Sequence, residues 1–364
     1  MTQPLYLDAA ATTPVALEVL EAMRPWLPAR PDPERERAAR AALEAQLADR
    51  LGVARGELRL VAGGSEANNL ALLGLARARA ARGRHVLSQP GEHPSVLRAL
   101  EALAAEGFEV EHLPLDAAGR VDPGRVAAAL RADTALVALM RGSNETGVLQ
   151  PVREVAELLL PRGTALHVDA VQSARHEPTT PALLGATTLA LTAHKLDGPK
   201  GVALLAGPGV EELPEPRGCA PPALALVAGL AAALARRSRL GTAEAAAVAA
   251  SRDALERELL ASVPDLVVTG AGAPRLPGHL HLRVARVSGE ALVLALDQAG
   301  ISASTGAACS SAEGPSPALL ALGLSPAEAS SSLRLSLPEA LDAGQRRRSV
   351  EALAQAVARL RALG

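Results

Sequence analysis

The chain has 364 residues, about twice the usual size of one domain, so we expect one large domain with a smaller companion. Lys and Arg number 37 against 39 Asp and Glu, a formal net charge of −2. This balance provides no basic field for nucleic acid or for an anionic membrane surface. Hydrophobic residues at 49% and charged residues at 21% are typical of a globular protein and exclude a disordered or collagen-like chain.

Apolar runs alternate with helical patterns through residues 16–245, which we expect to form the large domain. Short strands that are apolar on both faces and joined by helical crossovers are typical of a mostly parallel sheet covered by helices, a three-layer α/β fold. Ligands bind such sheets at the carboxyl ends of the strands. The predicted strands are residues 58–63, 85–89, 134–140, 165–170, 187–192 and 201–207.

Two Pro-rich stretches, residues 28–37 and 211–222, are predicted to be loops. Residues 218–235 contain 18 residues without a charge, which is the lower edge of the length that spans a membrane. Their composition is mostly Ala, Gly and Pro, without an aromatic belt, so we predict a buried helix rather than a membrane span.

The pattern changes at residue 242, after which longer helices alternate with two strands. We expect residues 246–364, together with residues 1–15, to form the smaller α+β domain. Its predicted helices are residues 242–263, 289–300 and 342–362, and its predicted strands are residues 279–285 and 331–337.

Lysine and cysteine are scarce in this sequence, which limits the residues that could act as amine or thiol groups in a reaction. The sequence has two lysines, Lys195 and Lys200, so a reaction that needs an amine has two candidates. It also has two cysteines, Cys219 and Cys309, too few for a disulfide framework or a four-thiolate metal site, so we expect a reducing compartment and no metal centre. Because the N-terminal sequence lacks the pattern of a secretory signal, we expect a cytoplasmic protein.

Lys195 and Asp169 each follow an apolar strand, where a parallel sheet binds its ligands. A lysine there can form a Schiff base, because burial and the neighbouring His194 lower the pKa of its amine. The alternative for Lys195 is a solvated surface lysine. Asp169 suits a cationic ring nitrogen such as that of pyridoxal phosphate (PLP), and the equally weighted alternative is a helix cap.

Two further turns lie at strand ends. The Gly63–Gly64–Ser65 turn opens a helix, and backbone amides there, with the Ser65 hydroxyl, can hold a phosphate, although such a turn alone is weak evidence. His93 follows the next strand and can stack on a cofactor ring or carry protons. A surface loop histidine is the alternative reading.

Two residues of the C-terminal half, Cys309 and Arg334, complete the candidate site. Cys309 lies in a Gly-, Ser- and Ala-rich stretch that favours an accessible loop able to bring a thiolate to a substrate, whereas Cys219 is expected to pack inertly. Arg334 lies within a predicted strand, where a guanidinium needs a carboxylate partner, either that of a substrate or that of an internal salt bridge.

Six motifs occur in order along nearly the whole chain: YLDAAATTPV (6–15), GGSEANN (63–69), SNETGVLQPV (143–152), LHVDAVQSA (166–174), AHKLDGPKG (193–201) and STGAACSS (304–311). They resemble the motifs of the cysteine desulfurases of the class V aminotransferase family, which are fold-type I PLP enzymes. The resemblance implies conversion of L-cysteine to L-alanine, with sulfur passed to a cysteine persulfide and then to an acceptor or scaffold protein for iron–sulfur cluster or thiocofactor synthesis. It also implies a homodimer.

The resemblance assigns a role to each candidate residue. Lys195 would bind PLP covalently, and Cys309 would attack the substrate sulfur. The remaining assignments are Asp169 on the ring nitrogen, Gln172 on the ring hydroxyl, His93 over the ring, Gly64, Ser65, Thr192 and His194 on the phosphate, and Asn144 and Arg334 on the substrate carboxylate.

The sequence departs from the family pattern in two segments of the rim that a dimer would share. Residues 28–37 replace a GNPSS-x-H segment, and residues 211–222 replace a stretch that ends in Arg-x-Gly-Thr. Two alternatives therefore stay beside the desulfurase reading. One is a related PLP lyase or aminotransferase with another substrate, and the other is a non-catalytic family member that acts as a binding partner.

Overall fold

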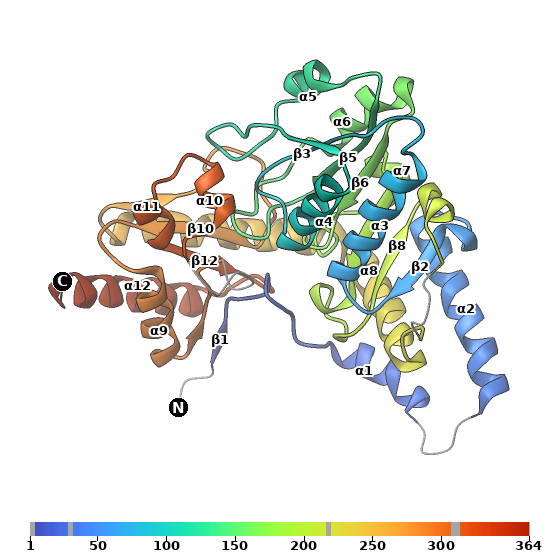
Figure 1. Ribbon diagram of the computed structural model, residues 1–364. Coiled ribbons are helices and arrows are strands. Elements are labelled where there is room, and N and C mark those ends of the chain that lie inside the picture. Colours follow the sequence, from blue (N-terminus) through green and yellow to red (C-terminus); the bar gives the residue numbers. More distant parts are fainter. Residues whose placement is uncertain (1–3, 28–31, 216–219, 307–313, 364) are drawn as a thin grey trace.

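The computed structural model describes residues 4–27, 32–215, 220–306 and 314–363. A seven-stranded sheet lies at its centre, in the order β2-β8-β7-β6-β5-β3-β4 (Figure 1). The neighbouring strands from β7 to β4 run parallel, and β8 is antiparallel to both of its neighbours. The strands are β2 (Leu58–Val61), β3 (His85–Ser88), β4 (Glu109–His112), β5 (Thr134–Met140), β6 (Ala165–Asp169), β7 (Thr188–Thr192) and β8 (Ala203–Ala206).

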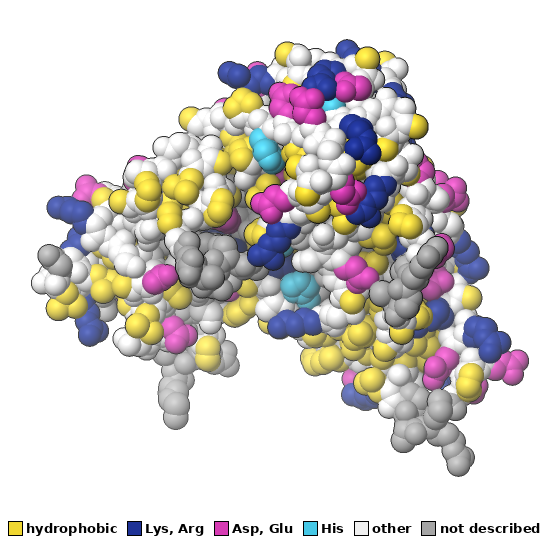
Figure 2. All heavy atoms as spheres, viewed as in Figure 1, with side chains coloured by type: hydrophobic (Ala, Val, Ile, Leu, Met, Phe, Trp, Pro, Cys, Tyr) yellow, Lys and Arg dark blue, Asp and Glu magenta, His cyan; other side chains and the backbone are white. Residues whose placement is uncertain are grey.

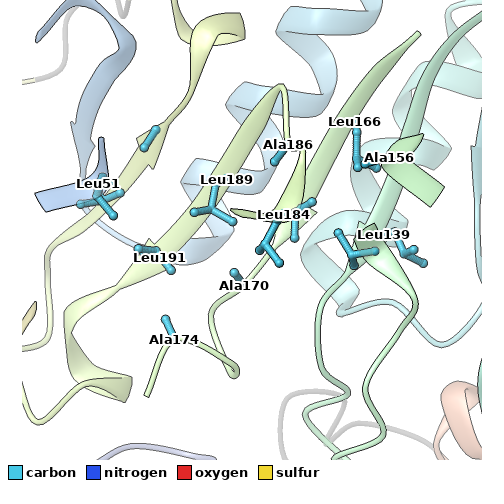
Figure 3. Close-up of a cluster of buried hydrophobic side chains, with 14 of the residues drawn as sticks. Leu51, Leu139, Ala156, Leu166, Ala170, Ala174, Leu184, Ala186, Leu189 and Leu191 are labelled. Carbon is cyan, nitrogen blue, oxygen red and sulfur yellow. The ribbon is translucent and has the colours of Figure 1, made fainter. Parts of the chain in front are cut away.

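Helices cover both faces of this sheet, which confirms the predicted three-layer α/β fold. Alternate residues of β5 belong to different cores, since Leu136 packs with α3 and α4 whereas Val137 packs with the helices of the opposite face, as the two-residue period of a strand requires. Figure 3 shows part of the core on the Val137 face, to which β5, β6 and β7 contribute Leu139, Leu166 and Leu189.

A smaller three-stranded antiparallel sheet, β12-β10-β9, forms beside the large sheet with its own hydrophobic core. Its strands are β9 (Leu266–Val268), β10 (His279–Val284) and β12 (Ser332–Ser336), while the short strands β1 (Leu5–Tyr6) and β11 (Ile301–Ser302) pair in parallel nearby. The side chains of Leu5 and Leu7 belong to this smaller core. The N-terminal residues therefore pack with the C-terminal part of the chain.

The helices include one that contacts both sheets, α8, which runs behind the molecule in Figure 1. Gly241 interrupts it with φ 59°, a left-handed value that suits glycine. The domain boundary at 245/246 therefore falls inside α8 and stays a prediction. The helices are α1 (Leu17–Met23), α2 (Pro33–Leu51), α3 (Gly64–Ala78), α4 (Pro94–Ala105), α5 (Pro123–Ala129), α6 (Val152–Leu159), α7 (Pro181–Leu184), α8 (Leu224–Ser262), α9 (Gly289–Gln298), α10 (Pro317–Ala321), α11 (Pro326–Ser330) and α12 (Ala343–Leu363).

The structure corrects two sequence predictions. Residues 33–37, predicted as loop, open α2, because the Asp32 side chain caps the helix by accepting a hydrogen bond from the Arg35 amide at 3.1 Å and Pro33 occupies the first helical position. Strand β4 was not predicted, because its sequence, EVEH, is polar and mostly exposed at the sheet edge.

The prediction of a buried helix in the uncharged stretch 218–235 is confirmed for its described residues. The first turns of α8 are buried against the large sheet. Among the helices of the described ranges, none combines the length and apolarity needed to cross a membrane.

We expect Leu189→Ala to lower the free energy of unfolding by about 2–5 kcal/mol, because Leu189 is fully buried in the middle of the large sheet and its truncation leaves a cavity. Leu183→Ala is the matched control, since Leu183 is 53% exposed and its truncation should change stability by no more than about 0.5 kcal/mol. Urea unfolding followed by circular dichroism measures both. Equal losses would contradict the assignment of this core.

Candidate functional site

A cavity of about 130 Å³ lies at the carboxyl edge of the large sheet. Strands β5 and β6 end in its wall at Met140 and Asp169, and the turn after β7 brings Lys195 to it. The smaller sheet contributes Arg334 from β12. The full lining is Ala10, Ala11, His93, Met140, Gly142, Asn144, Asp169, Val171, Gln172, Lys195, Gly306 and Arg334.

Lys195 ends a short 3-10 turn that follows β7 directly. Its Nζ donates hydrogen bonds to the backbone carbonyls of Ala10 and, at 2.6 Å, of Ala11. The N-terminal segment therefore fixes the position of the amine. Lys195 is half-buried at a strand end, as predicted, rather than a solvated surface lysine.

His194 lies beside this amine and is anchored to the same N-terminal segment, with 3.2 Å between its Nδ1 and the Thr12 hydroxyl. Burial, together with the positive charges of Lys195 and Lys200, lowers the pKa of His194 to about 4. His194 is therefore neutral at pH 7, so it offers a ring N–H without placing a second charge beside Lys195.

The Asp169 carboxylate is held by two donors: the Asn68 amide nitrogen at 2.7 Å from Oδ2 and the Val171 backbone amide at 3.0 Å from Oδ1. Asn68 Oδ1 in turn lies 3.0 Å from His167 Nε2, and His167 Nδ1 lies 2.9 Å from the Thr188 hydroxyl. Because an amide oxygen only accepts, the His167 proton is on Nε2. Burial lowers the pKa of His167 to about 4, consistent with this neutral tautomer.

His93 is the residue before α4 and caps it, with the Ser95 amide donating to His93 Nδ1 at 3.1 Å. This bond leaves the ring proton on Nε2. The side chain lines the cavity, so His93 is not a histidine of a remote surface loop. Ser95 also connects His93 to Asn68, whose amide donates to the Ser95 hydroxyl at 3.0 Å.

The amino end of α3 lies against the base of the cavity. A Cβ added at Gly64 would approach Val171 Cγ2 to 3.2 Å and Thr192 Cβ to 3.9 Å, so this end of the helix lies close to the cavity residue Val171 and to the end of β7. Exposed amides at a helix N-terminus bind phosphate. Gly64, Ser65 and Thr192 are therefore next to the cavity lining rather than within it.

The Arg334 guanidinium is 4% exposed and forms an ion pair with Asp8 at 2.7 Å. It also donates to the Asn144 backbone carbonyl at 2.8 Å. Both of these contacts use terminal nitrogens, and Arg334 Nε has no hydrogen-bond partner among the described residues. The internal salt bridge that the sequence left as an alternative is therefore present. The Nε–H of Arg334 remains as a further donor next to the cavity.

Two of the predicted residues, Cys219 and Cys309, lie outside the described residues. Gly306, three residues before Cys309, lines the cavity. Ser316, seven residues after it, donates to Glu145 Oε1 at 2.7 Å. Burial raises the pKa of Glu145, which lies near Arg334 and His93.

Sequence reasoning missed several residues that position the site. Asn68 and Asp8 stand inside the quoted motifs, but a motif does not say that Asn68 holds Asp169 or that Asp8 holds Arg334. The carbonyl of Ala10 has no side-chain signal at all, although Lys195 and Gln172 both donate to it. Within the ranges that the structure describes, no three His, Cys, Asp or Glu side chains cluster as metal ligands do.

Comparison with known proteins assigns the family. The family profile "Aminotransferase class-V" matches residues 5–216 and 209–343. The chain belongs to the class-V aminotransferase family. Members of this family that are similar to it include the cysteine desulfurase IscS of Anaeromyxobacter sp. (strain Fw109-5), 37% identical over 93% of this chain and 88% of that protein, and the cysteine desulfurase IscS of Dictyoglomus turgidum, 34% identical over 93% and 90%.

Solved structures of similar proteins have the same fold as this chain. A NifS-like protein covers 98% of this chain and 100% of its own with a TM-score of 0.86 at 24% identity, which shows the shared fold. DndA from Streptomyces lividans is 32% identical, with a TM-score of 0.74 over 91% of this chain and 99% of its own. SspA, solved in complex with cysteine, is 27% identical with a TM-score of 0.76 over 92% and 99%. The family is PLP-dependent.

The buried carboxyl of Glu92 gives a pH-dependent prediction. Burial raises its pKa from 4.5 to about 8, so between these values the folded chain holds one proton more than the unfolded chain. The Glu92 contribution to the free energy of unfolding should then fall as pH rises through this window, by up to about 1.4 kcal/mol per pH unit, opposite in sign to that of buried histidines such as His167. We expect Glu92→Gln to remove this contribution, so the difference in free energy of unfolding, wild type minus variant, should fall as pH rises. Urea unfolding at pH 5.5, 6.5 and 7.5 tests it, and parallel curves for the two proteins would contradict the raised pKa.

Proposed function

We propose that this chain is a PLP-dependent cysteine desulfurase that converts L-cysteine to L-alanine and transfers the sulfur to Cys309 as a persulfide. The observation that carries the proposal is that Lys195, Asp169, His93 and Arg334 line one cavity. An amine, a carboxylate, an imidazole and a guanidinium are the groups needed to hold an aldehyde cofactor and an amino acid together.

The donor set of the cavity fits PLP. The Asp169 carboxylate, oriented by Asn68 and Val171, suits a protonated ring nitrogen, and Gln172 uses one amide hydrogen on the Ala10 carbonyl, leaving the other for the ring hydroxyl. His93 would stack over the ring. When bound, PLP supplies an electron sink for charge at the substrate α-carbon. The proposed phosphate ligands are Gly64, Ser65, Thr192 and His194.

The neighbours of these groups keep their protons in defined places. Lys195 Nζ lies within reach of the Ala10 and Ala11 carbonyls, which would hold the amine close to the substrate while it takes the α-proton. His93 carries its own ring proton on Nε2, because the Ser95 amide donates to Nδ1. We therefore assign proton transfer to these two side chains.

The sulfur step needs the thiolate of Cys309. As the thiolate attacks the substrate sulfur, the new S–S bond forms and the substrate C–S bond breaks, with its electron pair remaining on the substrate carbon. That carbon then takes a proton and leaves as alanine. The atoms balance without an external oxidant, because cysteine and the Cys309 thiol together give alanine and the Cys309 persulfide.

The substrate carboxylate is assigned to Arg334 and Asn144. Asp8 occupies one terminal nitrogen of the guanidinium and fixes its plane, and Nε has no partner among the described residues. A planar fork that is already oriented binds a carboxylate with less loss of side-chain entropy than a flexible amine does.

Protein partners are also part of the proposal. Figure 2 shows hydrophobic side chains gathered over α1 and the adjoining part of α8, where Leu17 is 80% and Leu20 44% exposed. An exposed apolar surface of this kind is stabilised when a second copy of the chain covers it, so we assign it to a homodimer interface. The persulfide would pass to a sulfur-acceptor or iron–sulfur scaffold protein. The low cysteine content supports a cytoplasmic location.

We expect Cys309→Ala to abolish formation of sulfide from L-cysteine, because the variant has no thiolate to accept the sulfur. Sulfide and alanine are measured together for both proteins in the presence of PLP and a reductant. The wild type should give equal amounts of the two products. Unchanged sulfide release by the variant would reject the persulfide route and favour a lyase with another mechanism, and a wild type without an absorbance change on adding PLP would favour a non-catalytic member.

Arg334→Lys should raise the KM for cysteine about 10- to 100-fold, because the substitution removes one charged hydrogen bond worth about 1.5–3 kcal/mol. The control is Arg283→Lys, on the neighbouring strand β10, where Arg283 pairs with Glu328 at 2.9 Å. Steady-state kinetics should show an unchanged KM for this control. The assignment of Arg334 to the substrate fails if its variant also keeps the wild-type KM.

A further inference from the structure

A second cavity, of about 230 Å³, shares no lining residue with the candidate active site. It lies between the carboxyl end of α2, the turn that follows β6 and the middle of α8, where Gly241 interrupts the helix. Its volume is well above the ~10–15 Å³ that one water needs. The side chains that matter for its chemistry are Arg50, Arg175, His176, Thr179, Arg237 and Ser238.

The cationic groups of this cavity are only partly neutralised. Arg175 and Arg237 both form ion pairs with the buried Asp197, to which Arg236 also contributes at 3.4 Å. Arg236 has a closer partner of its own, Glu18, at 2.7 Å, so Asp197 mainly serves Arg175 and Arg237. Arg237 has a second partner, Glu244, at 2.7 Å.

The remaining lining charges do not offset this excess. Glu177 is the lining carboxylate, and both of its oxygens already face Arg141, at 3.0 and 3.2 Å. Arg50 forms no ion pair with any of the described residues. With Arg175 and Arg237 paired to Asp197 and Glu244, the positive charge of Arg50 is the part of the lining charge that no carboxylate of the described residues balances.

Donor atoms here are buried and unused. Nε of Arg50, Arg175 and Arg237 and Nδ1 of His176 are inaccessible and have no hydrogen-bond partner within the described part of the chain. Arg175 and His176 are 9% and 8% exposed. Leaving a buried polar group unpaired costs about 1–3 kcal/mol, and more if it is charged, so four such atoms around one cavity indicate a missing acceptor.

We propose that this cavity binds a small oxyanion of the phosphate type, held by Arg50, Arg175 and Arg237. Guanidinium forks match the tetrahedral oxygens of phosphate and donate to two of them at once. Thr179 lies in the same wall, with its hydroxyl donating to the Glu177 carbonyl at 2.9 Å. The site is independent of the proposed function, because none of its residues lines the candidate active site.

The electrostatics of His176 agree with an anion site. Burial, together with the charges of Arg175 and Arg237, lowers the pKa of His176 to about 3, so this imidazole is neutral at pH 7 and can donate one N–H. Leu51 and Ala174 form an apolar part of the wall and belong to the core drawn in Figure 3. An apolar wall excludes water and strengthens the attraction between a bound anion and the guanidiniums.

Isothermal titration calorimetry on the full chain, loaded with PLP so that the groups at α3 are occupied, tests the site. Sodium phosphate is titrated at constant ionic strength set with NaCl, and glycerol phosphate forms a second arm. We expect one saturable site per chain. Saturation by inorganic phosphate alone assigns the site to the free anion, and saturation by both assigns it to phosphate esters as well.

Arg50→Gln should weaken phosphate binding at least tenfold without unfolding the chain, because Arg50 supports no ion pair. Arg347→Gln is the control. Arg347 is 76% exposed on α12, so this substitution removes the same charge at a position that does not line the cavity. Ser238→Asp is a second variant that places a negative charge in the wall and should also weaken binding. The proposal is overturned if the wild type gives no saturable heat, which would mean a water-filled cavity, or if Arg50→Gln and Arg347→Gln weaken binding equally.

Discussion

The segment of residues 7–13, which turns at residues 9–11, hydrogen-bonds to the smaller sheet and to the 3-10 turn that follows β7, and the geometry of the site depends on it. On one side the backbone amide of Ala9 donates to Ser336 of the smaller sheet at 3.1 Å, and on the other the Thr13 amide donates to the carbonyl of His194 at 2.9 Å. Between these two anchors the segment presents its carbonyls to Lys195 and Gln172. The Lys195 amine is therefore positioned by backbone atoms, which have fewer rotatable bonds than a side-chain partner.

A second constraint is the buried polar chain that runs from Asp169 through Asn68 and His167 to Thr188. It crosses the apolar interior of the sheet, where an unpaired polar group is costly, so each member is stable only while its neighbour is present. Because the Asp169 carboxylate only accepts, Asn68 turns its amide nitrogen to Asp169 and its oxygen to His167, which puts the proton of the neutral His167 on Nε2. The position of the Asp169 carboxylate is therefore tied to hydrogen bonds that extend as far as Thr188.

The sequence predicts those features that follow from burial and strand length. Asp169 was placed at the edge of the sheet because an apolar strand ends there and parallel strands end together. Asn68 was missed, because a helical asparagine looks the same in sequence whether it faces solvent or a buried carboxylate. The helix start at Pro33 was hidden by the surrounding prolines, although Asp32 followed by Pro33 is a capping signal. Strand β4 carries no apolar pattern, because it lies at an edge that is mostly exposed.

The arginine-rich surface has a consequence for selectivity toward aldehydes. A guanidinium stays protonated in proteins and does not condense with a carbonyl compound as an amine does. Of the two lysines in the sequence, Lys195 lines the cavity and Lys200 is exposed. A free aldehyde meeting this protein therefore encounters very few side-chain amines that compete with the site. Because arginine carries most of the positive charge, an aldehyde cofactor present in excess loses little to lysine adducts outside the site, and Lys200 is the exposed lysine that can form one.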